Sequence, residues 1–343
     1  MNENQLRYDL AAWYNKYKRD LPWRHTSDPY KIWISEIMLQ QTQVETVKPY
    51  YLNFIEHFPD VQSLACAPME DLLKQWEGLG YYRRARHLKE AAVMIVETFG
   101  GEFPHTYEDI LTLKGIGNYT ASAISSIAFG IPKGVIDGNT LRILSRIYNR
   151  QDNIALDKTR KLYQQLIDHL ISPDHPSEFN QGMMDLGATV CTPRKPQCGQ
   201  CPLQKHCKAY LNGTQGLLPV NLKCTNKTDI YLITALIKKD NRYLLVKNKP
   251  GLLENLYGFV QYEVESPRSF EELFESEFGA PIRLNEYVKE VKHVFSHRIW
   301  HMHVYTGNLS HEIKGSLYTK EEMLSLPIST AHLKVLNAVT CGF

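Results

Sequence analysis

Four cysteines within 17 residues constrain this chain more than any other feature of its sequence. They are Cys191, Cys198, Cys201 and Cys207, with the spacing C-x6-C-x2-C-x5-C. Four thiolates so close in the chain can surround one metal centre, and both zinc and a four-iron four-sulfur cluster accept four cysteine ligands. Zinc sites usually contain two short C-x2–4-C pairs, whereas this segment has one short pair flanked by single cysteines. The spacing therefore favours one 4Fe-4S cluster over zinc and over four unliganded cysteines.

The rest of the composition is that of an ordinary globular chain. The three other cysteines are scattered, and the odd total of seven argues against a disulfide scaffold. At roughly 150 residues per domain, 343 residues predict two or three domains. The net charge of +2 does not by itself indicate nucleic-acid binding. The sequence shows neither an apolar membrane span nor a secretory signal, so we expect a cytoplasmic protein without a membrane role.

Hydrophobic periodicity divides the chain into two regions. Apolar residues recur at three- and four-residue spacing through residues 1–211, which predicts an all-α region. Residues 212–229 are rich in Asn, Gly and Thr and predict a linker. Residues 230–343 combine strand-like and helix-like runs, which predicts a mixed α/β domain. The expected helices include 118–130, 139–149, 157–171, 177–190, 267–278, 320–325 and 329–339, and the expected strands are 231–239, 242–247, 256–260, 288–295 and 301–309. Near the start of the chain, Leu21-Pro22 predicts the end of one helix, and Asp28 as N-cap with Pro29 at the first helical position predicts the start of the next.

The segment LKGIGNYTA (113–121) predicts a tight turn between two helices. Gly115 and Gly117 can both adopt positive φ angles, which a sharp turn requires. The helix that follows begins with free backbone N–H groups, which can bind a DNA phosphate. A purely structural turn is the alternative, because many helical hairpins turn on glycine.

Two carboxylates are candidates for chemistry. Glu36 lies beside Trp33 on an otherwise apolar helical face, where burial would raise its pKa and keep it protonated. The alternative is a glutamate at the edge of that face, reaching water. Asp137 precedes Gly138 at the expected start of a helix, where an ordinary N-cap is the plain interpretation.

Four segments carry a family resemblance. They are SEIMLQQTQV (35–44), EGLGYYRRARHL (77–88), VIDGNT (135–140) and NQGMMDLG (180–187). Together with the hairpin and the cysteines, they resemble the A/G-specific adenine DNA glycosylases (MutY type) of the helix-hairpin-helix superfamily. The resemblance covers residues ~5–210 strongly and 225–343 more weakly. It implies a six-helix barrel module over roughly 25–135 and a cluster-bearing module over roughly 1–24 and 136–211, which together clamp DNA.

The resemblance also implies a reaction. Such an enzyme flips adenine out of a duplex containing an 8-oxoguanine:A or G:A mispair and hydrolyses its N-glycosidic bond. Glu36 would protonate the base and Asp137 would stabilise the oxocarbenium-like sugar. Related glycosylase/lyases have a Lys at the position of Tyr119, so we expect a monofunctional enzyme. We further expect a bacterial monomer that acts at the nucleoid.

Further roles follow residue by residue from the same resemblance, with ordinary packing or solvation as the alternative for each. Tyr119 and Asn139 would position Asp137 and the sugar. The adenine pocket would contain Trp23, Arg24, Leu39 and Gln181. Gln41 and Tyr81 would enter the base stack. Backbone phosphates would be bound by Gly115, Gly117, Arg83, Arg84 and Arg86.

The C-terminal region, 230–343, resembles the Nudix fold without its hydrolase chemistry. Gly258 is followed by Val264 where the Nudix signature requires Glu, and no Arg-Glu pair follows. The resemblance implies that Phe295, Ser296 and His297 recognise 8-oxoguanine opposite the adenine, whereas a polar hairpin turn is the alternative. Two competing hypotheses are a nucleotide hydrolase that uses this domain and a non-catalytic, cluster-bearing damage sensor.

Overall fold

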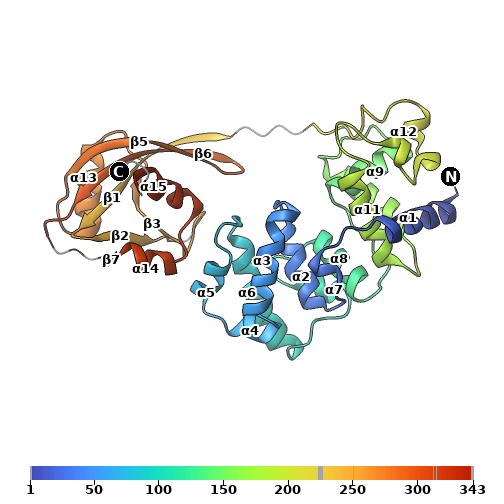
Figure 1. Cartoon of the computed structure of the whole chain (residues 1–343), viewed down its shortest axis with the longest axis horizontal. Coiled ribbons are helices and arrows are strands. Elements are labelled where there is room, and N and C mark those ends of the chain that lie inside the picture. Colours follow the sequence, from blue (N-terminus) through green and yellow to red (C-terminus); the bar gives the residue numbers. More distant parts are fainter. Residues whose placement is uncertain (1, 223–226, 250, 312, 314, 341–343) are drawn as a thin grey trace. The chain divides into compact units, whose positions relative to one another are not determined.

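The computed structural model describes residues 2–222, 227–249, 251–311, 313 and 315–340. The chain forms two compact units, residues 1–66 with 86–223 and residues 67–85 with 224–343, which Figure 1 colours along the sequence. No helix in the described part of the chain is both long and apolar enough to span a membrane. The domain boundaries inferred from sequence stay a prediction, and residues 223–226 of the expected linker lie outside the described residues.

The described residues of the first unit form helices and short 3-10 turns. Its elements are α1 (Glu3–Tyr17), η1 (Pro22–Arg24), α2 (Pro29–Leu39), α3 (Val44–His57), α4 (Val61–Cys66), α7 (Tyr107–Thr112), α8 (Asn118–Ala128), α9 (Gly138–Tyr148), α10 (Asp157–Leu170), α11 (Pro176–Thr189), η2 (Cys198–Gln200), η3 (Gln204–His206) and α12 (Lys208–Leu211). Helix α6 (Arg83–Phe99) begins in the segment assigned to the second unit and continues into the first.

Local chemistry explains where α2 begins. The side chain of Asp28 accepts a hydrogen bond from the backbone N–H of Tyr30 at 2.9 Å, and Pro29 occupies the first helical position. The sequence predicted both features. Helix α1, by contrast, ends at Tyr17 rather than at the expected Leu21-Pro22, because Lys18 leaves the helical region with ψ 138°.

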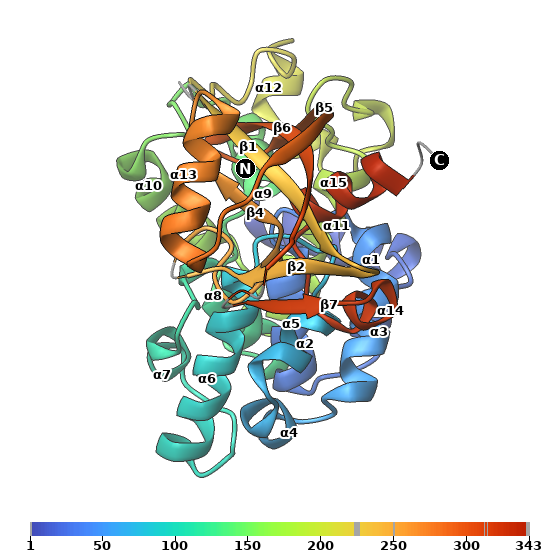
Figure 2. The ribbon, with the colours of Figure 1, turned by 90° about the vertical axis from the view of Figure 1, so that its left-hand side faces the viewer.

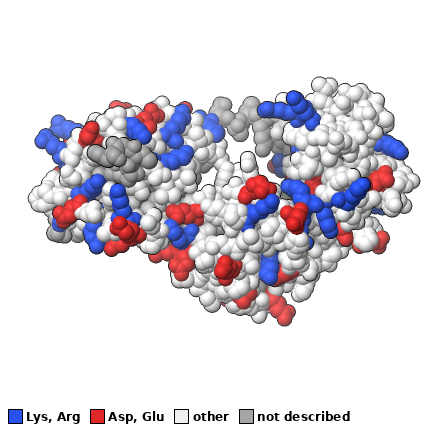
Figure 3. Space-filling model, viewed as in Figure 1, with Lys and Arg blue, Asp and Glu red and all other residues white. Residues whose placement is uncertain are grey.

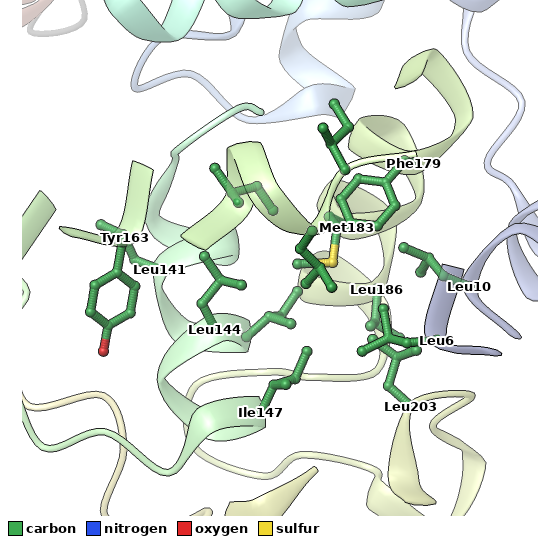
Figure 4. Packing of buried hydrophobic residues seen from close by; sticks show 14 of the residues in the cluster. Leu6, Leu10, Leu141, Leu144, Ile147, Tyr163, Phe179, Met183, Leu186 and Leu203 are labelled. Carbon is green, nitrogen blue, oxygen red and sulfur yellow. The ribbon is translucent and has the colours of Figure 1, made fainter. Parts of the chain in front are cut away.

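A hydrophobic core fixes the orientation of α9 and α11. Figure 4 shows Leu144 of α9 packed near Met183 and Leu186 of α11, with Leu6 and Leu10 of α1 beside them. All five side chains are buried. Burying a side chain of this size stabilises the fold by about 1.5–3 kcal/mol. The first residues of α9 are therefore held firmly against α11.

The second unit contains a mixed seven-stranded sheet and three helices in addition to the segment 67–85. Its elements are α5 (Met69–Gln75), β1 (Thr228–Lys239), β2 (Arg242–Lys247), β3 (Tyr257–Gly258), β4 (Val260–Tyr262), α13 (Pro267–Phe278), β5 (Leu284–Val294), β6 (Arg298–Asn308), β7 (Ser316–Tyr318), α14 (Lys320–Ser325) and α15 (Thr330–Thr340). The main strand order is β3-β2-β1-β6-β5, with β4 paired to β1 and β7 to β2.

The sheet has helices on both sides. Strands β1 and β6 pair in parallel from Thr228↔Arg298 to Lys238↔Asn308. The pairs β1–β2, β1–β4, β2–β3, β2–β7 and β5–β6 are antiparallel. Helix α13 covers one face and α15 lies on the other, as Figures 1 and 2 show. The mixed α/β architecture expected from sequence is confirmed.

Two details of the sheet differ from the prediction. The run 256–260 is not one strand, since it divides into β3 and β4 around Phe259. Strand β7 was not predicted, because three residues are too few to show an alternating pattern. Both differences come from strands shorter than the pattern that identifies a strand.

A neutral histidine is buried where α15 meets β3. His332 is fully buried, and its Nδ1 accepts a hydrogen bond from the backbone N–H of Phe259 at 3.1 Å. Burial lowers the pKa of His332 to about 4, and the charge of nearby His293 lowers it further in the same direction. The folded unit therefore binds this proton less readily than the unfolded chain does.

We predict that the stability of the second unit falls as the pH decreases from about 6.5 to 4. His332 would contribute a slope of up to about 1.4 kcal/mol per pH unit, because only the unfolded chain is protonated in that interval. His332→Gln, which cannot titrate, should reduce this slope. Urea unfolding, monitored through the protection of backbone amides in β1 and β6 from hydrogen exchange, measures the free energy of unfolding at each pH. Identical slopes of this free energy against pH in wild type and His332→Gln would contradict the assignment.

Candidate active site

Glu36 lies in a pocket of the first unit that contains all four residues predicted for adenine binding. Trp23 and Arg24 come from η1, Leu39 from α2 and Gln181 from α11, and all four line the pocket with Glu36. The other lining residues, which sequence reasoning did not identify, are Arg19, Leu21, Ile32, Ser35, Val44, Ile127 and Met184, beside the predicted Tyr119. The missed residues are mostly apolar, and nothing in their spacing distinguishes a pocket wall from a core.

The carboxyl group of Glu36 is buried, with 5% of the residue exposed. The hydroxyl of Tyr119 on α8 donates a hydrogen bond to its Oε2 at 2.8 Å. Burial raises the pKa of Glu36 to about 7; the Tyr119 hydrogen bond lowers it, the charge of Asp137 raises it and that of Arg24 lowers it. The expectation of a raised pKa is confirmed, and the alternative of a water-exposed glutamate is wrong.

Asp137 is the N-cap of α9, as its plain sequence interpretation predicted. Its Oδ1 accepts a hydrogen bond from the backbone N–H of Thr140 at 2.6 Å, and its Oδ2 accepts one from Asn139 Nδ2 at 2.9 Å. Capping does not exclude chemistry, because the same carboxylate raises the pKa of both Glu36 and Tyr119. The charge of Asp137 therefore acts on two residues that line the pocket, Glu36 and Tyr119.

Asn139 is held from its other side by an arginine that sequence reasoning missed. Arg142 Nη2 donates to Asn139 Oδ1 and to the carbonyl of Gly187, both at 2.8 Å. Arg142 Nε donates to the carbonyl of Cys191 at 2.7 Å. A chain of hydrogen bonds thus runs from the first cysteine of the cluster through Arg142 and Asn139 to Asp137.

The turn at 113–121 has one left-handed glycine, not two. Gly115 has φ +77°, and a Cβ there would lie 2.6 Å from the Cβ of His87. Gly117 has φ −106° and is the N-cap of α8, so the expected positive φ at this position is wrong. The helix nevertheless begins directly after the turn, so its first N–H groups point out of the hairpin as a phosphate site requires.

The four clustered cysteines line a single pocket with Arg146. All four are free thiols, and within the described residues no three His, Cys, Asp or Glu side chains converge on the space of one ion. Four thiols around a shared space can hold an iron–sulfur cluster, and they are also a ligand set that zinc accepts. Burial raises the pKa of Cys201 to about 12, so the thiolates need a metal centre to compensate their charge.

Arg146 braces the cysteine loop from α9. It is fully buried, and its guanidinium donates to Cys191 Sγ at 3.2 Å, to the carbonyl of Thr192 at 2.8 Å and to that of Pro193 at 3.0 Å. A buried cation beside thiolates offsets part of their charge. The sequence offered one signal for it, an Arg on the apolar face of α9.

In the second unit, two residues predicted to contact the damaged base pair lie together. Tyr81 and Ser296 are 215 positions apart, yet Tyr81 OH and Ser296 Oγ are 3.0 Å apart. Ser296 and His297 are exposed, whereas Phe295 packs edge-on against Trp300 with ring centroids 4.8 Å apart. The three residues predicted to recognise 8-oxoguanine occupy the turn between β5 and β6, which is closed by a hydrogen bond from Phe295 N to the Arg298 carbonyl at 2.8 Å.

Gln41 and Tyr81, the two residues predicted to enter the base stack, both have positive φ angles. Gln41, in the first unit, has φ +57°, and Tyr81, in the second, has φ +49°. Non-glycine residues in this region carry strain of order 1–3 kcal/mol and concentrate at functional sites. Tyr81 is also 47% exposed.

The three arginines predicted to bind phosphates differ in their burial. Arg83 is exposed and Arg86 is half-buried. Arg84 is buried, its guanidinium lies over the Trp76 ring and it donates to the carbonyls of Leu79 and Gly80. Arg84 therefore holds the 76–81 loop together, and its role as a phosphate contact stays a prediction. Elsewhere, basic and acidic side chains are interspersed on the face shown in Figure 3.

Three of the four glutamates on α13 have side-chain partners within the domain. Glu271 accepts from the backbone N–H of Leu284 at 2.8 Å, Glu272 pairs with Arg268 at 3.1 Å, and Glu277 accepts from Tyr262 OH at 2.6 Å. Each of these carboxylates is used to hold an element of the domain, and together they do not form a magnesium site in the described residues.

Known protein families and solved structures identify the class of protein to which the helical region belongs. Residues 34–169 match the HhH-GPD superfamily of base excision DNA repair proteins. Residues 191–207 match the iron-sulfur binding domain of endonuclease III, and residues 233–338 match the NUDIX domain. The solved structure of a thermostable thymine-DNA glycosylase superposes with TM-score 0.57 at 32% identity, covering 61% of this chain and 97% of that one. The helical region is thus a helix-hairpin-helix DNA glycosylase module with an iron–sulfur motif.

Curated relatives give the particular family. Adenine DNA glycosylase of Buchnera aphidicola subsp. Schizaphis graminum is 36% identical over 304 residues, covering 88% of this chain and 87% of that protein. The mouse adenine DNA glycosylase is 45% identical over 226 residues, which cover 62% of this chain and 43% of the mouse protein. The chain belongs to the adenine DNA glycosylase family.

The contact between α11 and Asn139 yields a test of the site's architecture. A Cβ on Gly187 would lie 2.4 Å from the Cβ of Asn139. We predict that Gly187→Ala displaces Asn139 from Asp137 and lowers stability by about 1–3 kcal/mol through overpacking. Thermal unfolding and a crystal structure of the variant measure both effects. Gly199→Ala is the matched control, because a Cβ there meets open space; equal effects in both variants would contradict the prediction.

Proposed function

We propose that this protein excises adenine from 8-oxoguanine:A and G:A mispairs in duplex DNA as a monofunctional glycosylase. The observation that carries the proposal is the buried carboxyl of Glu36, with a pKa of about 7, in a pocket influenced by the charge of Asp137. Membership of the adenine DNA glycosylase family supports the choice of base. We expect the enzyme to act as a cytoplasmic monomer on DNA at the nucleoid.

The proposed reaction begins with extrusion of the adenosine, which costs a few kcal/mol. Glu36, protonated near neutral pH, donates a proton to a ring nitrogen, so that adenine leaves as a neutral base. General acid catalysis of this kind contributes roughly 10²–10⁴-fold. Tyr119 holds the Glu36 carboxyl in place through its 2.8 Å hydrogen bond.

Asp137 completes the proposed mechanism. Its carboxylate accepts hydrogen bonds from Thr140 N and Asn139 Nδ2, which fix its direction. An anion so placed stabilises the positive charge that develops on the sugar. Because position 119 is a tyrosine, it offers no amine for a Schiff base, and the DNA strand stays intact until alkali is added.

In the second unit, Phe295, Ser296 and His297 would recognise the 8-oxoguanine. Exposed Ser296 and His297 supply hydrogen-bonding groups, and Tyr81 lies within hydrogen-bonding distance of Ser296. We propose that one 4Fe-4S cluster is bound by the four clustered cysteines, beside the Arg146 guanidinium of α9. Gly115, Gly117, Arg83, Arg84 and Arg86 would bind phosphates.

The deciding experiment incubates the full chain with a duplex containing one 8-oxoguanine:A pair. Free adenine should appear, with strand breaks only after alkali. Nicking before alkali, trapped by borohydride, would instead identify a glycosylase/lyase, and tight binding without base release would identify a damage sensor. Magnesium-dependent phosphate or pyrophosphate release from 8-oxo-dGTP would favour the nucleotide hydrolase, which the partnered glutamates do not support.

Replacing either carboxylate should separate binding from turnover. We predict that Glu36→Gln and Asp137→Asn retain mispair affinity but each lose about 10²-fold or more in single-turnover rate, because the acid or the anion is missing. Band-shift titrations and quenched-flow assays measure the two quantities. Full activity in either variant would remove that residue from the mechanism.

Metal analysis tests the cluster. We predict about four iron atoms per chain, with broad visible absorbance that is lost when Cys201→Ala is purified in parallel. Stoichiometric zinc in a colourless protein would overturn the assignment. Cys66→Ala is the matched control, since Cys66 lies outside the cluster and should leave the iron content unchanged.

A further inference from the structure

A buried carboxylate that the mechanism does not use lies behind the base pocket. Asp185 on α11 is fully buried. It is four residues along α11 from Gln181, which lines the pocket. A buried carboxylate is costly unless its charge is compensated, so its partners indicate what it does.

Both partners of Asp185 are cations from the pocket wall. Arg24 binds the carboxylate with two hydrogen bonds, Nη1 to Oδ2 at 2.6 Å and Nη2 to Oδ1 at 2.8 Å. Arg19 Nε donates to Oδ1 at 2.7 Å, and the Arg19 backbone N–H donates to Oδ2 at 3.1 Å. Burial alone would raise the pKa of Asp185, but its hydrogen bonds and the charges of Arg24 and Arg19 bring it below the usual value.

Arg24 and Arg19 line the same pocket as Glu36. An arginine that turned toward Glu36 would stabilise its carboxylate and remove the acid from neutral solution. In the structure the fork of Arg24 is instead fully engaged, because Nη1 also donates to the Arg19 carbonyl at 3.1 Å and the guanidinium lies 5.6 Å from the Tyr14 ring centre. The geometry keeps the pocket's cations paired with Asp185.

We propose that Asp185 is a positioning residue of the active site, whose buried carboxylate holds Arg24 and Arg19 against the pocket wall so that neither pairs with Glu36. The proposal rests on the proposed function and extends it to the control of the acid. The groups that face Glu36 from the surrounding elements are Tyr119 on α8, Asp137 at the start of α9, Arg24 on η1 and Arg19 before it. Of these, only the arginines depend on Asp185.

The test is the pH dependence of single-turnover adenine release in the full chain. In wild type the rate should fall above about pH 7, where Glu36 loses its proton. In Asp185→Asn the released Arg24 should move this fall to lower pH by about one unit or more, a rate loss of about tenfold at pH 8 with little change at pH 5.5. A merely structural role would lower the rate at every pH and leave the position of the fall unchanged.

Three further variants protect the test against misfolding. Asp185→Glu keeps the anion and should retain the wild-type position of the fall. Arg24→Gln and the double variant Arg24→Gln/Asp185→Asn both lack Arg24, so no unpaired Arg24 can approach Glu36 in either. The rates of the two variants should therefore fall at the same pH. A fall that stays in place in Asp185→Asn, or that moves when Asp185→Asn is added to Arg24→Gln, would overturn the inference. Absence of adenine release from the wild type would instead contradict the proposed function.

Discussion

The chemistry proposed for this protein depends on the burial of one carboxyl group. Glu36 sits within a helix whose other residues are largely apolar, and its surroundings disfavour its charge strongly enough to raise its pKa to about 7. A hydrogen bond from Tyr119 opposes that shift and at the same time fixes the direction of the carboxyl. Burial keeps the Glu36 carboxyl protonated near neutral pH, as the proposed reaction needs. The surrounding helices maintain that burial.

Two buried arginines extend this organisation to the rest of the helical unit. Arg142 joins the carbonyl of Cys191 to Asn139 and hence to Asp137, and Arg146 joins the same cysteine loop to α9. Asp185 on α11 binds Arg24, which lines the pocket. Arg142, Arg146 and Asp185 are buried charged groups, and the protein supplies the partners named here. A charged group that is buried needs such partners to compensate for its lost hydration.

The sequence predicted much of this arrangement because its signals are local. Asp28 and Pro29 identified the start of α2, the alternating and continuous apolar runs identified β1 and β2, and the spacing of four cysteines identified the cluster loop. The pocket residues Trp23, Arg24, Leu39 and Gln181 came from family resemblance, since periodicity alone does not distinguish them from packing. The structure brings them together around Glu36, although their roles in adenine binding stay a prediction.

What the sequence did not predict depends on long-range contacts. The contacts of Arg142, Arg146 and Asp185 join residues 45 to 166 positions apart, and no local pattern reports such pairs. The resemblance predicted phosphate contacts for Arg83, Arg84 and Arg86, but it did not report that the loop carbonyls of Leu79 and Gly80 accept hydrogen bonds from Arg84. Gly117 was expected to be left-handed by analogy with Gly115, whereas the N-cap of a helix needs only extended backbone.

The claim on which the rest depends is that Glu36 is a protonated acid near neutral pH. Infrared difference titration of the free protein measures it directly, by comparing wild type with Glu36→Gln. The account predicts a buried carboxylic acid band that disappears with a midpoint near pH 7 in wild type and is absent from the variant. A wild-type spectrum in which Glu36 is already fully ionised at about pH 5.5, near the ordinary range of an exposed glutamate, would contradict it.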